Sequence, residues 1–162
     1  MNQTTWYKVP LYCIVSSIIV WYLTVWILGR FTLVTLPDGT ITVDSTRSLI
    51  LYGFTFLVVV CVGGLAFFRK LTKMEIFFSA SIWVVCQLGI LLVEWIIGGS
   101  QGVSGIIFLW LAKIFEWSNL LNQVLFSITD NLWFASIVQA FAPYIFLLFG
   151  KRRDRSVEEI EE

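Results

Sequence analysis

Long apolar runs with almost no charged residues are the feature that most constrains this chain. Residues 11–29 carry no charge, and as a helix they would reach roughly 28 Å, about the thickness of a bilayer's hydrocarbon core. Comparable runs lie at 48–68, 75–97 and 132–150. In lipid, a spanning segment must satisfy its own backbone polar groups, which favours helices. The sequence therefore predicts an all-α integral membrane protein with four transmembrane helices in one domain, residues 1–150.

The composition excludes several classes of protein. Hydrophobic residues make up 58% of the 162 and charged residues 14%, against roughly 45–50% and about 25% in soluble domains. The excess apolar surface indicates a lipid bilayer as the partner, and a net charge of zero gives no reason to expect nucleic acid. Histidine is absent, which removes imidazole-ligated haem, the usual zinc sites and His-based triads. We therefore predict no metal, no cofactor and no catalytic residue.

Three cysteines each lie within an apolar run: Cys13, Cys61 and Cys86. No two of them form a CxxC motif, so a thiol–disulfide enzyme is not indicated. Free cysteine commonly behaves as a small buried hydrophobe. We expect all three to be buried.

Residues 30–47, between the first two apolar runs, have the only strand-like pattern in the chain. Two runs rich in threonine and β-branched residues flank Pro37-Asp38-Gly39, a combination typical of a tight β-hairpin. An isolated two-stranded hairpin is marginally stable in water. We therefore expect this one to rest on the membrane surface, on the rest of the chain or on a partner. Asp44 is a candidate cap for the helix that follows.

Residues 105–126 combine apolar side chains with a polar stripe at helical spacing that includes Lys113 and Glu116. The stripe favours an interfacial or re-entrant amphipathic helix whose tryptophans lie at head-group level. A fifth crossing is the alternative, but it would bury Lys113 and Glu116 at a cost that an i,i+3 ion pair only softens.

The last apolar run, residues 132–150, has Thr129 and Asp130 as candidate caps and Pro143 in its interior. Proline removes a backbone hydrogen bond, so we expect a kink or a packing contact there. The run ends at a basic cluster, and residues 151–162 form a charged tail.

Basic residues are distributed unequally between the two faces that four crossings would create. The side with both termini holds eight of them and the other side three: Lys8, Arg69, Lys70, Lys73, Lys151, Arg152, Arg153 and Arg155, against Arg30, Arg47 and Lys113. The positive-inside rule then predicts a multi-pass protein of the cell membrane with both termini in the cytoplasm. The hairpin and the amphipathic helix would lie on the outer face.

Two acidic residues are the first candidate ligands. Glu94 is the one acid within an otherwise apolar span, and intramembrane acids are candidate functional groups. It lies roughly 28 Å along the helix from Glu75, near the outer interface, where snorkelling is the alternative interpretation. Asp130 precedes the last span. Together the two carboxylates could hold a cation or act on a lipid head group.

A second set of candidates falls near the predicted midplane. Gln87 lies roughly 18 Å from the start of the third span and Gln139 roughly 16 Å from the end of the last. The two amides could form an interhelical hydrogen bond, worth about 0.6–2 kcal/mol, or they could line a small polar pocket. Tyr22 lies at a similar depth and could join either arrangement.

The sequence contains no phosphate-binding loop, nucleophile motif or internal repeat. The leading interpretation is a small non-catalytic membrane protein, either an accessory subunit of a transport or assembly complex or a homo-oligomer. One alternative is a small-solute transporter or binding module with a midplane polar site. A lipid-modifying enzyme using Glu94 and Asp130 is the second alternative.

Overall fold

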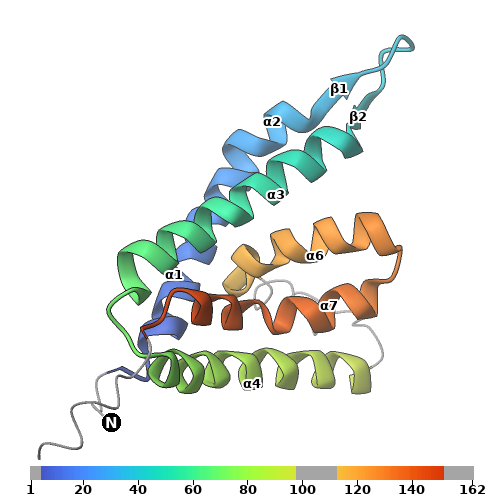
Figure 1. Cartoon of the computed structure of the whole chain (residues 1–162). Coiled ribbons are helices and arrows are strands. Elements are labelled where there is room, and N and C mark those ends of the chain that lie inside the picture. Colours follow the sequence, from blue (N-terminus) through green and yellow to red (C-terminus); the bar gives the residue numbers. More distant parts are fainter. Residues whose placement is uncertain (1–4, 98–112, 152–162) are drawn as a thin grey trace, which may run out of the picture.

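The computed structural model describes residues 5–97 and 113–151, apart from the side chains of Glu94 and Ile97, and is mostly helical (Figure 1). The elements in chain order are α1 (Lys8–Leu23), the π-helix η1 (Thr24–Leu28), α2 (Gly29–Thr32), β1 (Leu33–Thr35), β2 (Ile41–Val43), α3 (Ser45–Val62), the π-helix η2 (Gly63–Phe68), α4 (Lys73–Ile97), α6 (Glu116–Thr129), α7 (Leu132–Ala140) and the 3₁₀-helix η3 (Ala142–Leu148).

Three continuous helical stretches in the described part of the chain are long and apolar enough to cross a membrane. They are Lys8–Thr32, Ser45–Phe68 and Lys73–Val93, with 25, 24 and 21 residues. These stretches coincide with the first three apolar runs, so the prediction of three long apolar helices is confirmed. Each extends past the predicted run at its amino-terminal end, because Asp44 caps α3 through Arg47 N and Thr72 and Glu75 form a reciprocal capping box on α4.

The fourth apolar run, 132–150, does not form one continuous α-helix. Helix α7 has nine residues and ends at Ala140, and η3 follows with Pro143 in its first turn. Proline lacks the amide hydrogen that an α-helix would need there, so the break predicted at Pro143 is confirmed. The predicted caps Thr129 and Asp130 were the wrong residues, because Asn131 caps α7 by accepting a hydrogen bond from Phe134 N.

The predicted hairpin is present but shorter than residues 30–47. Strands β1 and β2 pair antiparallel, with Leu33 opposite Val43, whereas the flanking residues belong to α2 and α3. At the turn, Gly39 has a φ of +82°, which glycine adopts without a Cβ penalty. Hydrogen bonds from the Thr40 hydroxyl and amide hold the pKa of Asp38 below its usual range.

Helix α6 lies within the segment 105–126, for which an interfacial or re-entrant helix was expected and of which residues 105–112 lie outside the described part of the chain. It packs against α1, α3 and α7, and it forms an antiparallel pair with α7 (Figure 1). Trp117 is completely buried within the chain. An amphipathic pattern shows that one face is apolar but not whether that face meets lipid or protein, and here it meets the other helices.

An aromatic core joins α3, η2, α6 and η3. Phe146 of η3 packs against Phe68 and Trp117, with ring centroids 4.6 and 5.7 Å away, and Trp117 stacks on Phe56 of α3. This core brings η3 against η2 and α6. Of the cysteines, only Cys13 is buried as expected, whereas Cys61 and Cys86 are exposed on apolar helix surfaces.

Candidate functional site

Polar side chains gather in a buried cluster between α6 and α7, which we call the amide cluster: Ser118, Asn122, Ser136 and Gln139. The spacing of these residues, i,i+4 on α6 and i,i+3 on α7, places each pair on one helix face. Asn122 Nδ2 donates to Gln139 Oε1 at 2.8 Å and to Ser136 Oγ at 3.0 Å. Gln139 Nε2 donates to Ser118 Oγ at 3.3 Å. The cluster therefore pairs the Asn122 Nδ2 and both polar atoms of the Gln139 amide with side chains of α6 and α7.

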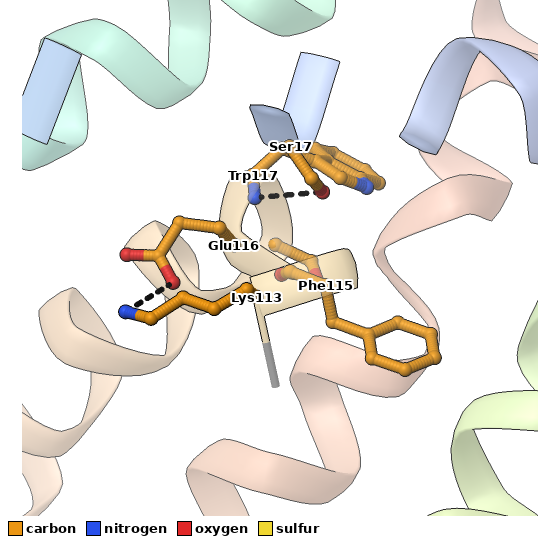
Figure 2. A network of polar contacts seen from close by, with 6 residues as sticks. Ser17, Lys113, Phe115, Glu116 and Trp117 are labelled. Carbon is orange, nitrogen blue, oxygen red and sulfur yellow. Dashed lines mark hydrogen bonds and ion pairs between the residues drawn. The ribbon is translucent and has the colours of Figure 1, made fainter. Parts of the chain in front are cut away.

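The start of α6 is fixed next to the amide cluster by contacts with two other helices. Trp117 N donates to Ser17 Oγ of α1 at 3.3 Å (Figure 2), so a side chain of α1 satisfies one of the free amides of this helix end. Phe115 packs on Trp83 of α4 at 4.8 Å between ring centroids. The start of α6 is thus held in a defined position within the bundle.

Lys113 and Glu116 form the i,i+3 ion pair that the sequence suggested. Lys113 Nζ lies 3.7 Å from Glu116 Oε2 (Figure 2), and the side-chain exposures are 46% and 7%. Because only the carboxylate is buried, the lysine reaches it from the more exposed side. The pair softens the cost of burying Glu116.

The two predicted amides, Gln87 and Gln139, have different environments. Gln139 binds Asn122 and Ser118, and no hydrogen bond joins it to Gln87 in the described residues. Gln87 is 4% exposed, and its Oε1 has no hydrogen-bond partner within residues 5–97 and 113–151. One turn earlier on α4, the Nε1 of the buried Trp83 is likewise without a partner in these residues.

Tyr22 and Asp130 do not join the amide cluster. Tyr22 is 57% exposed and packs on Trp26 of the same helical stretch. Asp130 is exposed in the turn between α6 and α7, with a left-handed backbone. Glu94 belongs to the last turns of α4, and its side chain lies outside the described part. The carboxyl end of α4 and the α6–α7 turn lie at the same end of the bundle (Figure 1).

Sequence reasoning missed the role of Ser118 and Ser136 and the pairing of Asn122 with Gln139. Two hydroxyls and two amides recurring at helical spacing on adjacent apolar segments were the available signal. Within the described ranges, no group of three or more His, Cys, Asp or Glu residues could hold a metal ion.

At the opposite end of the bundle, the starts of α1 and α4 and the end of η3 are tied together. Ser79 Oγ accepts from Val9 N at 3.0 Å and donates to Trp6 O at 2.7 Å. Lys73 N donates to Lys151 O at 3.1 Å, and Lys151 N donates to Leu71 O at 2.9 Å. Basic segments far apart in the sequence therefore meet at one end.

No protein-family model, no curated protein and no solved structure matches this chain.

Proposed function

We propose that this chain is a small non-catalytic integral membrane protein that acts by packing against another membrane-embedded chain. That chain is either the larger partner in a transport or assembly complex or a second copy. The observation that carries the proposal is the apolar surface of an outer arm, defined as η1, α2, the hairpin and the first half of α3, residues 24–54. The arm extends away from the rest of the bundle (Figure 1).

The outer arm buries very little of its apolar surface within the chain. No residue of η1 is buried, and several large side chains are half exposed or more: Val25, Trp26, Phe31, Ile50 and Phe54. Packing between membrane helices relies on van der Waals contact and interhelical hydrogen bonds. Because the amide cluster uses its polar groups within the chain, we assign partner binding to the outer arm, which extends away from the bundle (Figure 1).

Four crossings with both termini in the cytoplasm are part of the proposal. Helices α7 and η3 run antiparallel to α4 (Figure 1), and their nine and seven residues together reach roughly 28 Å at the rises of α- and 3₁₀-helices. Lys8, Lys73 and Lys151 belong to the segments that meet at one end, which suits the cytoplasmic side. In this arrangement α6 is a re-entrant helix that pairs with α7.

Photo-crosslinking from the outer arm tests the partner. Phe54 would be replaced by p-benzoylphenylalanine and the protein irradiated in its native membranes, with Val85 of α4 as the matched control. Both side chains are well exposed, at 65% and 68%. We expect a discrete higher-mass adduct from position 54 alone, and its mass identifies a second copy or a different chain. A monomer in mild detergent, with no discrete adduct from position 54, would overturn the proposal.

Thiol labelling tests the orientation separately. Thr40→Cys in the hairpin should react with a membrane-impermeant maleimide on intact cells, whereas Lys70→Cys should react only after permeabilisation. The wild-type chain supplies the background from Cys61 and Cys86. Labelling of Lys70→Cys on intact cells would contradict a cytoplasmic position of the basic turn.

Gln87 favours a second candidate function, a small-solute transporter or binding module. A buried carbonyl oxygen without a partner costs about 1–3 kcal/mol, and a polar solute could satisfy it together with the Nε1 of Trp83. If this is the function, Gln87→Leu should abolish uptake into reconstituted vesicles at unchanged folded yield, whereas Gln123→Leu should not. Unchanged uptake in the Gln87 variant would rule out this candidate.

A further inference from the structure

An apolar groove runs between α1 and α3, and it is separate from the amide cluster. Its volume is about 610 Å³, and the side chains that form its walls are mostly exposed on the outside of the bundle. Those used in the argument below are Leu11, Val15, Ile19, Val58, Val62 and Phe67. Along α1 the groove extends from Lys8 to Leu23, roughly 22 Å at 1.5 Å per residue. That length exceeds one leaflet, which is about half of a 30 Å core.

The floor of the groove is fixed by contacts within the chain. Tyr12 OH donates to Val59 O at 2.6 Å, which ties α1 to α3 across the groove. The ring of Tyr12 also packs on Phe67 and Phe68, with ring centroids 5.3 Å away in both cases. This hydrogen bond and the aromatic packing therefore fix the position of α1 relative to α3 at the floor of the groove.

The two ends of the groove differ in charge. Lys8 lines one end, and Arg69 and Lys70 directly follow Phe68, which also lines the groove. All three cationic side chains are exposed. One acid, Glu75, interacts electrostatically with Lys8, so the end keeps an excess of positive charge. The remaining lining is apolar apart from a few hydroxyl groups. This pattern of a long apolar groove with a cationic end matches an acyl chain attached to an anionic head group.

We propose that the groove binds an anionic phospholipid, with one acyl chain between α1 and α3 and the phosphate beside Lys8, Arg69 and Lys70. The inference shares with the proposed function only the location in a membrane, and it does not depend on a protein partner. The anionic lipids of a cytoplasmic leaflet would attract such a basic cluster.

Native mass spectrometry of the full-length protein tests the proposal. The protein would be titrated with phosphatidylglycerol and with phosphatidylcholine carrying the same palmitoyl and oleoyl chains. We expect the first phosphatidylglycerol to bind at least several-fold more tightly. Lys8→Gln should weaken this binding about fivefold, consistent with the usual contribution of one cation near an anionic surface. Lys151→Gln, at the same end of the bundle but outside the groove, should leave it unchanged.

A second pair of variants tests the apolar part of the groove. Val62→Trp should fill it and abolish binding of the first lipid, whereas Val85→Trp on the exposed face of α4 should not. Leu11→Trp replaces the Val62 variant if that protein does not fold, as judged by near-ultraviolet circular dichroism. Equal binding of both lipids, unaffected by the groove variants, would mean an unspecific lipid annulus and would overturn the proposal.

Two further outcomes would also overturn it. If glycerol phosphate, which has no acyl chain, binds as tightly as the lipid, the basic cluster is a phosphate site and not part of a lipid groove. If Val62→Trp instead halves the mass of the protein in detergent, the groove is covered by a second copy.

Discussion

Asn122 Nδ2 lies 2.8 Å from Gln139 Oε1, so an amide of α6 donates a hydrogen bond to an amide of α7 where both side chains are buried. This bond is part of the amide cluster, in which every donor and acceptor comes from the same two helices. The contact therefore holds α6 and α7 together and depends on both amides at once.

Removing both amides should cost less free energy of unfolding than the sum of the costs of removing each one alone. We expect Asn122→Leu to lower the free energy of unfolding by about 1–3 kcal/mol, because it leaves Gln139 Oε1 buried without its donor. The double variant Asn122→Leu/Gln139→Leu should lose less than the sum of the single variants. Thermal unfolding in mild detergent, followed by circular dichroism, measures all three.

Gln123→Leu is the control for the amide cluster, since Gln123 is on the same helix but only partly buried. It should change the unfolding temperature little. Strictly additive effects of the Asn122 and Gln139 variants would show that the two amides are not coupled.

Replacing Gln87 by leucine should raise the free energy of unfolding, whereas the same replacement of Asn122 should lower it. Its Oε1 is buried without a partner in the described residues, so Gln87→Leu removes a desolvated carbonyl and keeps a side chain of similar size. We expect the free energy of unfolding to rise by about 1 kcal/mol. Gln87→Asn, which keeps the amide, should not raise it. A clear loss of stability in Gln87→Leu would indicate that the carbonyl has a partner in the protein.

The positions of the three long helices could be predicted from the sequence, because an uncharged run of sufficient length has few other folds available to it. The hairpin could be predicted for a similar reason, since Pro37-Asp38-Gly39 favours one local turn. These features depend on residues that are neighbours in the sequence. The interruption of the helix near Pro143 likewise depends on a local property of the sequence, the missing amide hydrogen of proline.

The candidate site was harder to predict because it depends on which helices are neighbours. Counting residues along a span gives depth, and it placed Gln87, Gln139 and Tyr22 at one level. Depth does not tell which side of the helix a residue is on. Tyr22 is on the exposed side of its helix and therefore does not join the two amides. Depth does not give the partner either: Gln139 binds Asn122 of α6, a helix that was expected to be interfacial or re-entrant.

Close packing of η2 against η3 makes Gly64 sensitive to substitution. A Cβ at this position would overlap the ring of Phe149, which lies directly after η3. We therefore expect Gly64→Ala to lower the free energy of unfolding by about 1–3 kcal/mol, the usual cost of overpacking. Adding Phe149→Leu should recover part of the loss. Thermal unfolding in mild detergent, followed by circular dichroism, measures both variants.

Gly89 of α4 is the matched control for Gly64. A Cβ at Gly89 would meet nothing within 4 Å, so Gly89→Ala should raise stability by up to about 1 kcal/mol through helix propensity alone. Equal effects of the two alanine substitutions would contradict the close contact between η2 and Phe149.

The turn between α6 and α7 depends on backbone conformation at Asp130, whose φ is 51°. Its amide donates to Phe126 O at 2.8 Å and so ends α6. A left-handed conformation costs roughly 1–2 kcal/mol for most residues and nothing for glycine. We expect Asp130→Gly to be at least as stable as the wild type and Asp130→Ala to be less stable than both.

This order of stabilities distinguishes a turn residue from a carboxylate ligand at Asp130. If the backbone conformation is what matters, glycine and alanine differ although neither carries a carboxylate. If a carboxylate contact is what matters, Asp130→Gly should also be less stable than the wild type. Asn131→Ala provides a scale for the comparison: it removes the hydrogen bond to Phe134 N, and loss of such a cap costs about 0.5–2 kcal/mol. Thermal unfolding of the three variants in one detergent decides between the two roles.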